Sequence, residues 1–530
     1  MQPRQDSPAE PVAAPPAEEQ PGAGFGARLK QLGSESLIYG LSAIVGRFLA
    51  FLLQPFYVSQ FTTGENGIQT LVYSVIPLIT VAFVLGLDVA YMRNAADVEK
   101  DPLRHRQQVF SMPFGMILVI GGALIGLGML LVPTAQALLH VPRYAVLYLL
   151  LIVYTDALLT VPFAHLRMAN QAKRYALLKV GFVIVSIILN VVLIVGLHWS
   201  VKAIFVANFV ANLLMLTLLL PEILRLFRPR LLTRGIGWRA LWAYALPIIP
   251  ATFFVMVVEQ ADKLLLSGMP PEIAAARYGL TARQVVGVYG WNYKLGVLML
   301  LVVQMFRMAW IPFSLNQGRD ETAPLLFSRV LTGLMLVCSA VFLLVVLFLP
   351  VVVHIPAVYH FPREPAYWLG LPIVPVILLG YIFSGIYAVV TAGLYIRRKT
   401  GILPFVAGAG AFVNVLICIW GRSHAGMVVV AWATPAAYLL MSILAAWQSN
   451  RFYPVPYEWT RLIHIAAIVA LLFFAGQWLG AQQLGFTPDV LVRLGLLAAF
   501  PVLLWATRFF RPGEWAALSQ ATARIGLPRR

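Results

Sequence analysis

Apolar runs of about 20 residues recur along the chain from Ser34 to Thr507, separated by short polar segments. Each run is long enough to cross a hydrocarbon layer of about 30 Å as an α-helix. The predicted spans, with boundaries good to several residues, are 34–57, 67–92, 109–132, 145–166, 177–197, 202–221, 240–264, 285–306, 327–352, 367–395, 402–420, 425–446, 462–480 and 490–507. The pattern therefore predicts an all-α, polytopic membrane protein with about 14 transmembrane helices.

The two ends of the chain differ from the apolar part. Residues 1–33 are rich in Pro, Ala and acidic residues and lack the basic start and apolar stretch of a secretory signal, so we expect a disordered cytoplasmic tail. Residues 508–530 form a basic tail. An even number of spans places both termini on one side of the membrane. Basic residues gather in the turns on that side, such as those with Arg104 and Arg397, which identifies it as the cytoplasm.

Composition supports a membrane location. Of the 530 residues, 60% are hydrophobic and 11% are charged, whereas charged residues make up about 25% of an ordinary soluble protein. The net charge of +18 requires no nucleic acid, because basic cytoplasmic loops and their attraction to anionic membrane lipids account for it. Cys338 and Cys418 lie in different spans, far apart in sequence, which excludes a disulfide framework and a zinc site of several thiolates.

The sequence lacks the common motifs of enzymes. It has no GxxxxGK(S/T) phosphate loop, no HExxH, no GxSxG and no clustered Asp-rich motif that would hold magnesium on a pyrophosphate. The longest predicted outer connection, between Ser267 and Gln284, is too short for an extramembrane catalytic domain. We therefore expect no enzymatic activity, no cofactor and no metal.

Ionisable side chains inside the predicted spans are the most informative feature, since each costs several kcal/mol in hydrocarbon unless it faces water or a partner. These residues are Arg47, Asp88, Asp156, Glu259, Asp262, Lys263 and Lys294. Arg47 lies near the middle of the first span, too deep to reach the interface, so we expect it to face an internal cavity and hold an anionic ligand. The alternative is a buried ion pair with Asp88 or Asp156 that only fixes packing.

The seventh span carries the densest cluster of charges. Glu259 and Lys263 lie one helical turn apart, with Asp262 on a neighbouring azimuth, so all three can face one cavity. We expect Glu259 and Lys263 to be partly paired when no substrate is bound. Without such a partner, Lys263 would be a lone buried charge.

The eighth span places Tyr289, Tyr293 and Lys294 beside the same region if consecutive helices pack as a hairpin. Aromatic rings with hydrogen-bonding tips are good surfaces for sugars. The alternative is that Tyr289 and Trp291 belong to an interfacial aromatic belt. The candidate substrate-binding residues are Arg47, Lys263, Lys294, Tyr289 and Tyr293, and the candidates for ion coupling or charge pairing are Asp88, Asp156, Glu259 and Asp262.

Prolines interrupt several spans. We expect bends at Pro77 in the second span, at Pro247 and Pro250 in the seventh, and at Pro372 and Pro375 in the tenth, because proline removes a helical hydrogen bond. Such bends are common hinges in transporters, although membrane helices also tolerate proline without hinging.

Two stretches resemble one protein family. The first includes "SLIYGLSAIVGRFLAFLLQPFYVSQF", then Gly67, then "LGLDVAYMR"; the second includes "ALPIIP", "ADKLLL", "VGVYGWNYKLGVLMLL" and "FRMAWIPF". Both resemble the bacterial polysaccharide-export flippases of the multidrug/oligosaccharidyl-lipid/polysaccharide (MOP) exporter superfamily. The sequence departs from the family at Asn66, where a tyrosine is common, and in a connection lengthened by "PPEIAAARYGLTARQ".

The resemblance implies an architecture and a function. It implies two six-helix bundles, 34–221 and 240–446, joined by a basic cytoplasmic linker at 222–239 and followed by two further helices within 447–507. The bundles would enclose a cationic cavity, and Gly67 and Gly287 would begin equivalent spans of the two halves. The implied activity is alternating-access transport of a lipid-linked oligosaccharide on a polyprenyl pyrophosphate across the bacterial plasma membrane, with a proton or sodium as a possible coupling ion.

Two other functions remain open. A drug or metabolite antiporter of the same superfamily would share the helix count, but its cavity would be mainly acidic to attract organic cations. A membrane glycosyltransferase or polymerase would need an acidic catalytic group on a large outer loop, for which Glu272 is the available residue.

Overall fold

The computed structural model describes residues 45–46, 48–49, 51–95, 102–231, 246, 248–318, 320–480, 482 and 485–510, and the regular secondary structure in these ranges is helical. Twelve of the described helices are long and apolar enough to cross a membrane. They match twelve of the predicted spans. The other two are described in part: residues 51–60 are helical at the end of the predicted span 34–57, and α10 (Ile248–Leu266) lies in the predicted span 240–264. The predicted fold class, an all-helical polytopic membrane protein, is confirmed.

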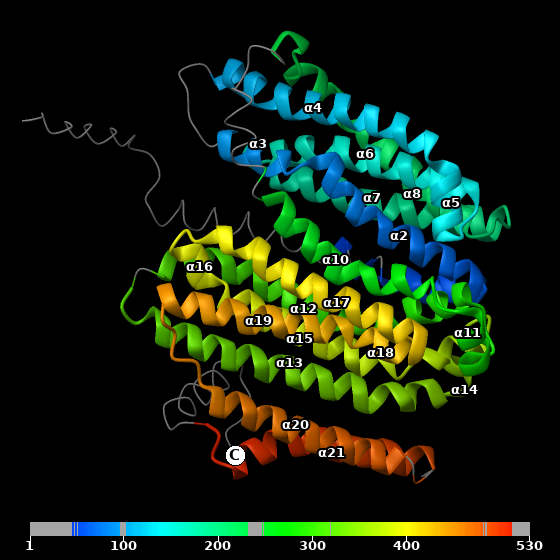
Figure 1. Cartoon of the computed structure of the whole chain (residues 1–530), viewed down its shortest axis with the longest axis vertical. Coiled ribbons are helices and arrows are strands. Elements are labelled where there is room, and N and C mark those ends of the chain that lie inside the picture. Colours follow the sequence, from blue (N-terminus) through cyan, green and yellow to red (C-terminus); the bar gives the residue numbers. More distant parts are fainter. Residues whose placement is uncertain are drawn as a thin grey trace, which may run out of the picture.

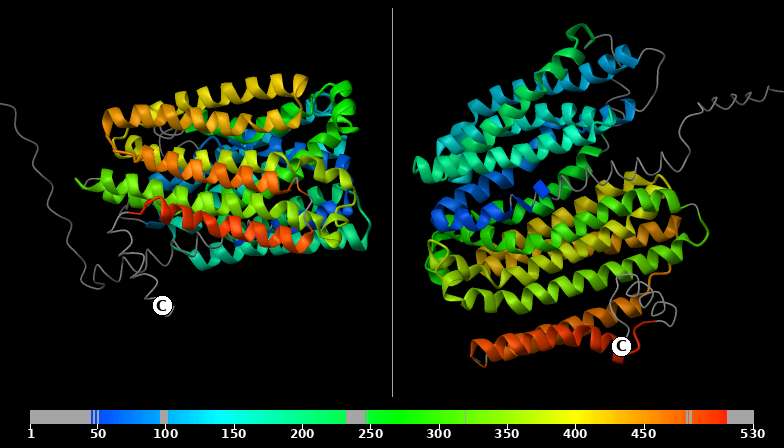
Figure 2. Two further views of the ribbon diagram at one scale, coloured as in Figure 1. Left: turned by 90° about the horizontal axis from the view of Figure 1, so that it is seen from below. Right: turned by 180° about the vertical axis from the view of Figure 1, so that it is seen from behind.

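The helices form three layers (Figure 1). The first layer, here called the N-lobe, comprises helical residues 51–60, α2 (Thr63–Val84), α3 (Leu87–Ala95), α4 (Pro102–Leu130), α5 (Val132–Leu139), α6 (Arg143–Met168), α7 (Ala172–Val191) with η1 (Val192–Gly196), α8 (Lys202–Leu226) and η2 (Pro229–Leu231). The middle layer, the C-lobe, comprises α10, α11 (Pro271–Tyr278), α12 (Ala282–Gln317), α13 (Ala323–His354), α14 (Pro356–Tyr359), η3 (Pro365–Gly370), α15 (Ile373–Val390), α16 (Ala392–Ile396), η4 (Thr400–Ile402), α17 (Leu403–His424), α18 (Met427–Ala431) and α19 (Ala433–Phe452). The third layer is the pair α20 (Trp459–Gly480) and α21 (Phe486–Ala506), which lies beyond the C-lobe in both Figure 1 and the right view of Figure 2.

The long helices run side by side, so the molecule has two ends. Arg93, Arg225 and Arg451 lie in the last turns of α3, α8 and α19, and Arg397 caps the C-terminus of α16; we call their end of the molecule the basic end. At the opposite end lie α5, α11 and α14 (Figure 1). Basic residues therefore gather at one end, as the sequence pattern predicts.

The helices α2 and α12 begin in the same way at the opposite end. Each has a capping box, formed by Thr62 with Glu65 at α2 and by Thr281 with Gln284 at α12. In a capping box the two side chains satisfy backbone N–H groups that the first helical turn leaves unpaired. A hydroxyl residue followed three positions later by Glu or Gln thus fixes both helix starts from local sequence.

The second span is broken where the sequence gives no proline. Its helix continues through Pro77 and ends at Val84, and Leu85 and Gly86 then have φ angles of 52° and 67° before α3 begins. A left-handed backbone costs little at glycine but is strained at leucine, so Gly86 favours the turn and Leu85 carries the strain. Pro372 is the N-cap residue of α15 and Pro375 lies in its first turn, where a proline removes no helical hydrogen bond, so these two prolines do not bend a continuous helix. Pro250 lies close to the first described residue of α10, and the bend expected there stays a prediction. Pro247 lies outside the described residues.

The pair α20–α21 is fixed to α13 by polar contacts at both of its ends. At the basic end, Glu458 accepts a hydrogen bond of 2.9 Å from Thr332 and pairs with Arg461 at 2.8 Å. At the opposite end, the buried Arg493 pairs with Asp489 at 2.8 Å and donates to the Leu347 carbonyl at 2.7 Å. These contacts hold the third layer against the C-lobe.

Candidate functional site

A cavity of about 380 Å³ lies between the two lobes, and we call it the central cavity. Its wall comes from helical residues 51–60, α2, α7 and α8 on the N-lobe side and from α10 and α12 on the C-lobe side. The polar residues of the wall are Gln54, Tyr57, Gln69, Thr70, Tyr73, Ser74, Ser186, Asn208, Gln260, Lys263, Tyr293 and Lys294. This wall carries two lysines, and no carboxylate lines the cavity within the part of the chain that the structure describes.

Lys294 projects from α12 into the central cavity. Its ammonium donates a hydrogen bond across the lobe boundary to Oε1 of Gln54. Among the described residues, no carboxylate forms an ion pair with Lys294. An ammonium inside the helix bundle whose neighbour is a neutral amide favours an anionic ligand, because its charge is not balanced locally. The structure thus brings Lys294 to the predicted cavity.

Lys263, from α10, reaches the same cavity but is already neutralised. Its ammonium lies 2.9 Å from Asp262 Oδ1, donates to the Glu259 carbonyl at 2.7 Å and sits 3.5 Å from the centroid of the Tyr293 ring. The predicted partial pairing of Lys263 with the Glu259 carboxylate is therefore wrong. The adjacent Asp262 takes that role because the lysine side chain folds back along its own helix.

Glu259 points instead to tyrosines. Its carboxylate accepts hydrogen bonds from Tyr438 and, at 3.3 Å, from Tyr381, and the hydroxyl oxygens of Tyr381 and Tyr293 are hydrogen-bonded at 2.9 Å. Phenol donors stabilise a carboxylate without neutralising its charge. The result is a continuous C-lobe network of α10, α12, α15 and α19 that reaches the cavity wall at Tyr293.

Tyr289 belongs to this network and does not line the central cavity. It is fully buried, and its hydroxyl donates to Asp262 Oδ2 at 2.7 Å. It therefore orients the acid that neutralises Lys263. The alternative of an interfacial belt is wrong for Tyr289, which has a hydrogen-bond partner in the core.

The remaining ionisable candidates are dispersed. Asp156 lies in the N-lobe, where its Oδ1 accepts a hydrogen bond of 2.7 Å from Asn212, and it lines a separate cavity. Asp88 lies in the first turn of α3, just after the break in the second span, and does not line the central cavity. Arg47 lies outside the described residues, and with it the expected pair with Asp88 or Asp156.

The lobes are joined at the opposite end by close backbone packing. The N-terminal turns of α2 and α12 meet at Gly67 and Gly287, where a Cβ at Gly287 would collide with the Thr63 carbonyl and lie 2.9 Å from the Gly67 nitrogen. Asn66 donates across this contact to the Gly287 carbonyl at 2.9 Å. The two predicted equivalent glycines thus face each other, and each allows the approach of the other helix.

A second set of contacts closes the same end. Glu364, just before η3, accepts hydrogen bonds from the backbone nitrogen and the hydroxyl of Thr63 at 2.8 and 2.6 Å. Tyr367 donates to the carbonyls of Phe61 and Thr62 at 3.0 and 2.9 Å. Burial raises the pKa of the Tyr367 phenol, so it remains a donor. The structure therefore holds the lobes together at the end opposite the basic residues.

Sequence reasoning missed Gln54, Asn208, Asn212 and Glu364. The first three are neutral amides within apolar spans, and a search for ionisable side chains alone passes over them. An amide also needs a hydrogen-bond partner in hydrocarbon, which is the signal that would have found them. Glu364 lies outside a predicted helix, and only the folded chain places it at Thr63, 301 residues away.

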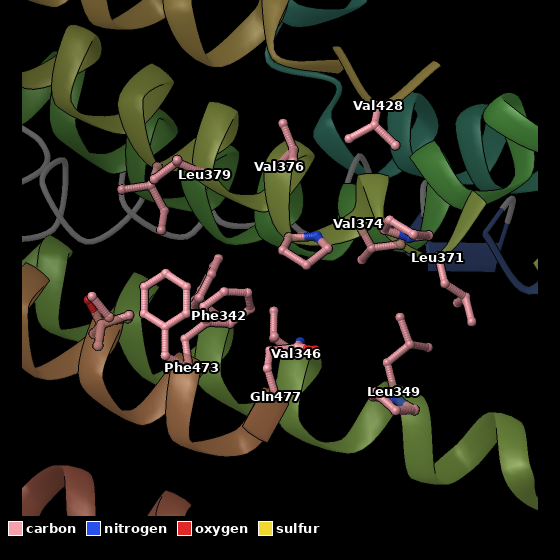
Figure 3. Close-up of a pocket in the computed structure, with 18 of the residues that line it drawn as sticks. Phe342, Val346, Leu349, Leu371, Val374, Val376, Leu379, Val428, Phe473 and Gln477 are labelled. Atoms are coloured by element: carbon pink, nitrogen blue, oxygen red, sulfur yellow. The ribbon is translucent and has the colours of Figure 1, made fainter. Parts of the chain in front are cut away.

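A second, apolar cavity of about 650 Å³ lies between the C-lobe and the third layer. Figure 3 shows Phe342, Val346 and Leu349 from α13 and Phe473 from α20 pointing into it, opposite side chains of α15. Its wall is nearly all aliphatic or aromatic, with Gln477 and Ser339 among the few polar members. Such a groove suits a hydrocarbon chain.

Taken together, these features define a membrane protein with two helical lobes around a polar cavity and an added helix pair. Comparison with solved structures identifies the fold as that of the MOP-superfamily transporters. A lipid II flippase MurJ in an inward closed conformation matches with a TM-score of 0.66 and 12% identity, over 89% of this chain and 100% of that one. A multidrug resistance MATE family transporter of the MOP superfamily, in its inward-facing conformation, matches with a TM-score of 0.60 and 13% identity, over 80% of this chain and 97% of that one.

These structural relatives are transporters rather than enzymes. A third, a mutant of the Vibrio cholerae MATE transporter VcmN, has a TM-score of 0.53 and 14% identity, over 80% of this chain and 97% of that one. No protein-family description and no curated protein sequence matches the chain. The likeness at these identities is one of fold.

Proposed function

We propose that the protein moves a lipid-linked oligosaccharide, carried on a polyprenyl pyrophosphate, across a bacterial plasma membrane by alternating access. The observation that carries the proposal is Lys294, a cation in the wall of the central cavity with no paired carboxylate among the described residues. Lys263 adds a second ammonium to the same wall, with Asp262 as its counter-ion. A pyrophosphate would find hydrogen-bond donors there, together with the polar wall that a sugar needs in the membrane.

The apolar groove beside the third layer supports a lipid-linked substrate. A polyprenyl chain is too apolar to enter the polar central cavity at low cost, so its tail must remain in hydrocarbon while the charged part crosses. The groove between α13, α15 and α20 offers an apolar surface of this kind (Figure 3). The charged part and the tail would thus use different surfaces of one molecule.

The proposed orientation places the basic end in the cytoplasm, as the positive-inside rule expects. Contacts at Glu364 and Gly287 then close the cavity on the outer side. A single cysteine at Arg277, in the last turn of α11, should react with a membrane-impermeant thiol reagent in intact cells, whereas one at Arg397 should not. Labelling at 397 would reverse the orientation.

Reconstitution tests the proposal directly. Purified protein in liposomes should move a fluorescent short-chain polyprenyl pyrophosphate that carries one sugar, measured as loss of protection from an external quencher. Lys294→Gln should abolish this movement, and Lys294→Arg should retain part of it, because the charge is kept but its position changes. Lys202→Gln, which removes an exposed lysine at the opposite end, is the matched control.

Full transport by Lys294→Gln, with wild-type abundance, would end the proposal for this site. Arg47 remains a predicted partner for the same anion, and Arg47→Ala should then abolish transport while the protein still reaches the membrane. Normal transport by Arg47→Ala would remove that residue from the binding site.

The alternative of a drug or metabolite antiporter has the MATE fold in its favour. The central cavity speaks against it, because its described wall offers two ammonium groups and no carboxylate to attract an organic cation. Transport of an organic cation by the same liposomes, with no movement of the lipid probe, would favour the antiporter.

Ion coupling is assigned in this proposal to Glu259. Its carboxylate is the acid of the C-lobe network that has phenols rather than an ammonium as side-chain partners. Binding of a proton there would loosen the bonds from Tyr381 and Tyr438 and, through Tyr381, change the contact with Tyr293 at the cavity wall. Glu259→Gln should therefore remove any stimulation of transport by a pH gradient while downhill transport continues. Unchanged stimulation would exclude Glu259.

A further inference from the structure

A third cavity, of about 190 Å³, lies inside the N-lobe between α6, α7 and α8, and we call it the N-lobe cavity. Asp156 and Arg167 from α6 and Lys179 from α7 line it, with the rings of Phe163 and Phe182. The function proposed above uses none of these side chains. Their combination of an acid, two cations and aromatic faces is unlike the wall of the central cavity.

Several polar groups of this cavity have unused hydrogen-bonding capacity in the described structure. Asp156 has one hydrogen bond, to Oδ1, which leaves Oδ2 without a bond among the described residues. The Lys179 ammonium lies 4.0 Å from the centroid of the Phe163 ring and makes no ion pair with Asp156. Nε of Arg167 is buried without a partner in the described part of the chain. Buried polar groups are normally satisfied, so these groups need water or a ligand.

The N-lobe cavity is connected to the central cavity in two ways. Phe182 forms part of both walls. In addition, a chain of hydrogen bonds runs from Asp156 through Asn212 and Asn208 to Tyr73, with distances of 2.7, 3.4 and 2.9 Å. Asn208 and Tyr73 line the central cavity, whereas Asp156 and Asn212 line the N-lobe cavity. A ligand held at the central site thus has a neighbouring polar cavity within reach.

We propose that the N-lobe cavity is a subsite for one sugar ring of the transported molecule, next to the anion site at Lys294. This inference rests on the proposed function. A sugar ring presents hydroxyls that both donate and accept, which match the Asp156 carboxylate, the Lys179 ammonium and the Arg167 guanidinium. Its less polar face suits the rings of Phe163 and Phe182. The volume, roughly six times that of a water molecule in the liquid, takes one ring rather than an extended chain of sugars.

Asp156 is the residue that selects a sugar over a second anion in this subsite. A phosphate would be drawn to Lys179 and Arg167 but repelled by the carboxylate beside them, whereas a hydroxyl donates to that carboxylate. Asn212 holds Asp156 in place at 2.7 Å. The central and N-lobe cavities would therefore recognise two chemically different parts of one substrate, the anionic linkage and the sugar attached to it.

Binding to full-length protein in lipid nanodiscs tests this subsite. The probes are a short-chain polyprenyl pyrophosphate without sugar and the same lipid carrying glucose, galactose or N-acetylglucosamine. We expect at least one sugar-bearing probe to bind on the order of tenfold more tightly than the sugarless lipid, since hydrogen bonds to charged groups carry that much free energy. Asp156→Asn should reduce this advantage to less than about twofold, with the affinity for the sugarless lipid unchanged.

Phe163→Leu provides a second variant, because it removes a ring face while keeping an apolar wall, and it should also reduce the sugar advantage. Asp320→Asn, at an exposed acid near the start of α13, is the matched control and should change nothing. Lys294→Gln should weaken binding of all probes by a similar factor. Unchanged affinity for the sugarless lipid shows that a variant is folded.

The outcomes separate the subsite from the proposed function. Equal affinities for all probes in the wild type, or a sugar advantage that survives Asp156→Asn and Phe163→Leu, would overturn the subsite and leave the anion site standing. Absence of binding by the sugarless lipid, together with no effect of Lys294→Gln, would instead overturn the proposed function. A sugar advantage that only the Asp156 and Phe163 variants lose supports both.

Discussion

The polar cluster around Asp262 in the C-lobe and the one around Asp156 in the N-lobe differ in how their side chains are bonded. In the C-lobe, the side chains of Asp262, Lys263, Tyr289 and Glu259 are bonded within the lobe itself, by an ion pair and by phenol donors. In the N-lobe, the side-chain bond to Asp156 comes from a neutral amide, and Lys179 lines the same cavity as Asp156 without forming an ion pair with it. The charged groups of the C-lobe network are therefore bonded to one another, whereas the N-lobe network leaves Oδ2 of Asp156 without a hydrogen bond among the described residues.

This difference shows that a charged residue inside a span must be interpreted together with its hydrogen-bond and ion-pair partners. The cost of burying a charge explains why it needs a partner, but the partner can be either a residue or a ligand. Lys263 and Lys294 line the same cavity, yet the first has an acid beside it and the second has an amide. The charge of Lys294 is therefore the one that an anionic ligand would balance, whereas Lys263 already has a counter-ion.

Of the variants that test this difference between the clusters, Asp262→Asn is expected to have the largest effect on stability. It leaves the Lys263 ammonium, which is 7% exposed, without its acid, and an uncompensated buried charge typically costs about 3–5 kcal/mol of stability. Thermal unfolding in detergent should show a large loss, and the double variant Asp262→Asn with Lys263→Met should recover most of it. Lys294→Met, which breaks no ion pair among the described residues, should not destabilise in this way. If Lys294→Met lowered the stability as much as Asp262→Asn does, the distinction between a paired Lys263 and an unpaired Lys294 would be wrong.

A smaller but still large effect is expected from Gly287→Ala, which acts where the lobes meet. The added methyl group would collide with the Thr63 backbone, and overpacking of this kind costs about 1–3 kcal/mol, or roughly thirtyfold in transport at the middle of that range. Liposome transport and membrane abundance should be measured together. Gly333→Ala, where a Cβ meets nothing within 4 Å, is the matched control. Transport at the control level would show that close approach of α2 and α12 is dispensable.

Glu364→Gln should loosen the same end by less. Glutamine retains an acceptor for Thr63 but loses the negative charge that strengthens both bonds, a change of about 1 kcal/mol or roughly fivefold in the population of the closed form. Spin labels at the exposed His198 and Glu272, one on each lobe, should report a longer mean distance. Glu321→Gln at the basic end serves as control. An unchanged distance distribution would mean that the glycine contact alone keeps the end closed.

The smallest effect is expected from Asn208→Leu in the N-lobe. It removes the 2.9 Å bond to Tyr73 and the acceptor for Asn212, but no charge is stranded, so the loss of stability should be below about 1 kcal/mol. Thermal unfolding of Asn208→Leu and Asp262→Asn under the same conditions compares the two losses of stability directly. A loss as large as that of the C-lobe variant would show that the two networks are equally important for folding.

The sequence alone determined the class of the protein and much of its layout. The length and hydrophobicity of the apolar runs predicted the helices, because the backbone groups of a chain in hydrocarbon must form hydrogen bonds within each span. Local capping pairs at Thr62 and Thr281 set the starts of α2 and α12, and the two glycines that the resemblance marked as equivalent do face each other. These features depend on residues near in sequence or on the solvent, which sequence patterns record.

Tertiary structure decided which polar groups meet. It paired Lys263 with Asp262 rather than with the Glu259 carboxylate, placed Tyr289 behind the cavity wall and set Gln54 against Lys294, 240 residues away. It also broke the second span at Leu85 and Gly86 instead of at a proline. Rotamers and helix packing fix such choices, and the spacing of residues along one helix allows several of them. The sequence therefore shows which charged residues lie within the spans, but the packing of the helices determines which partner each of them binds.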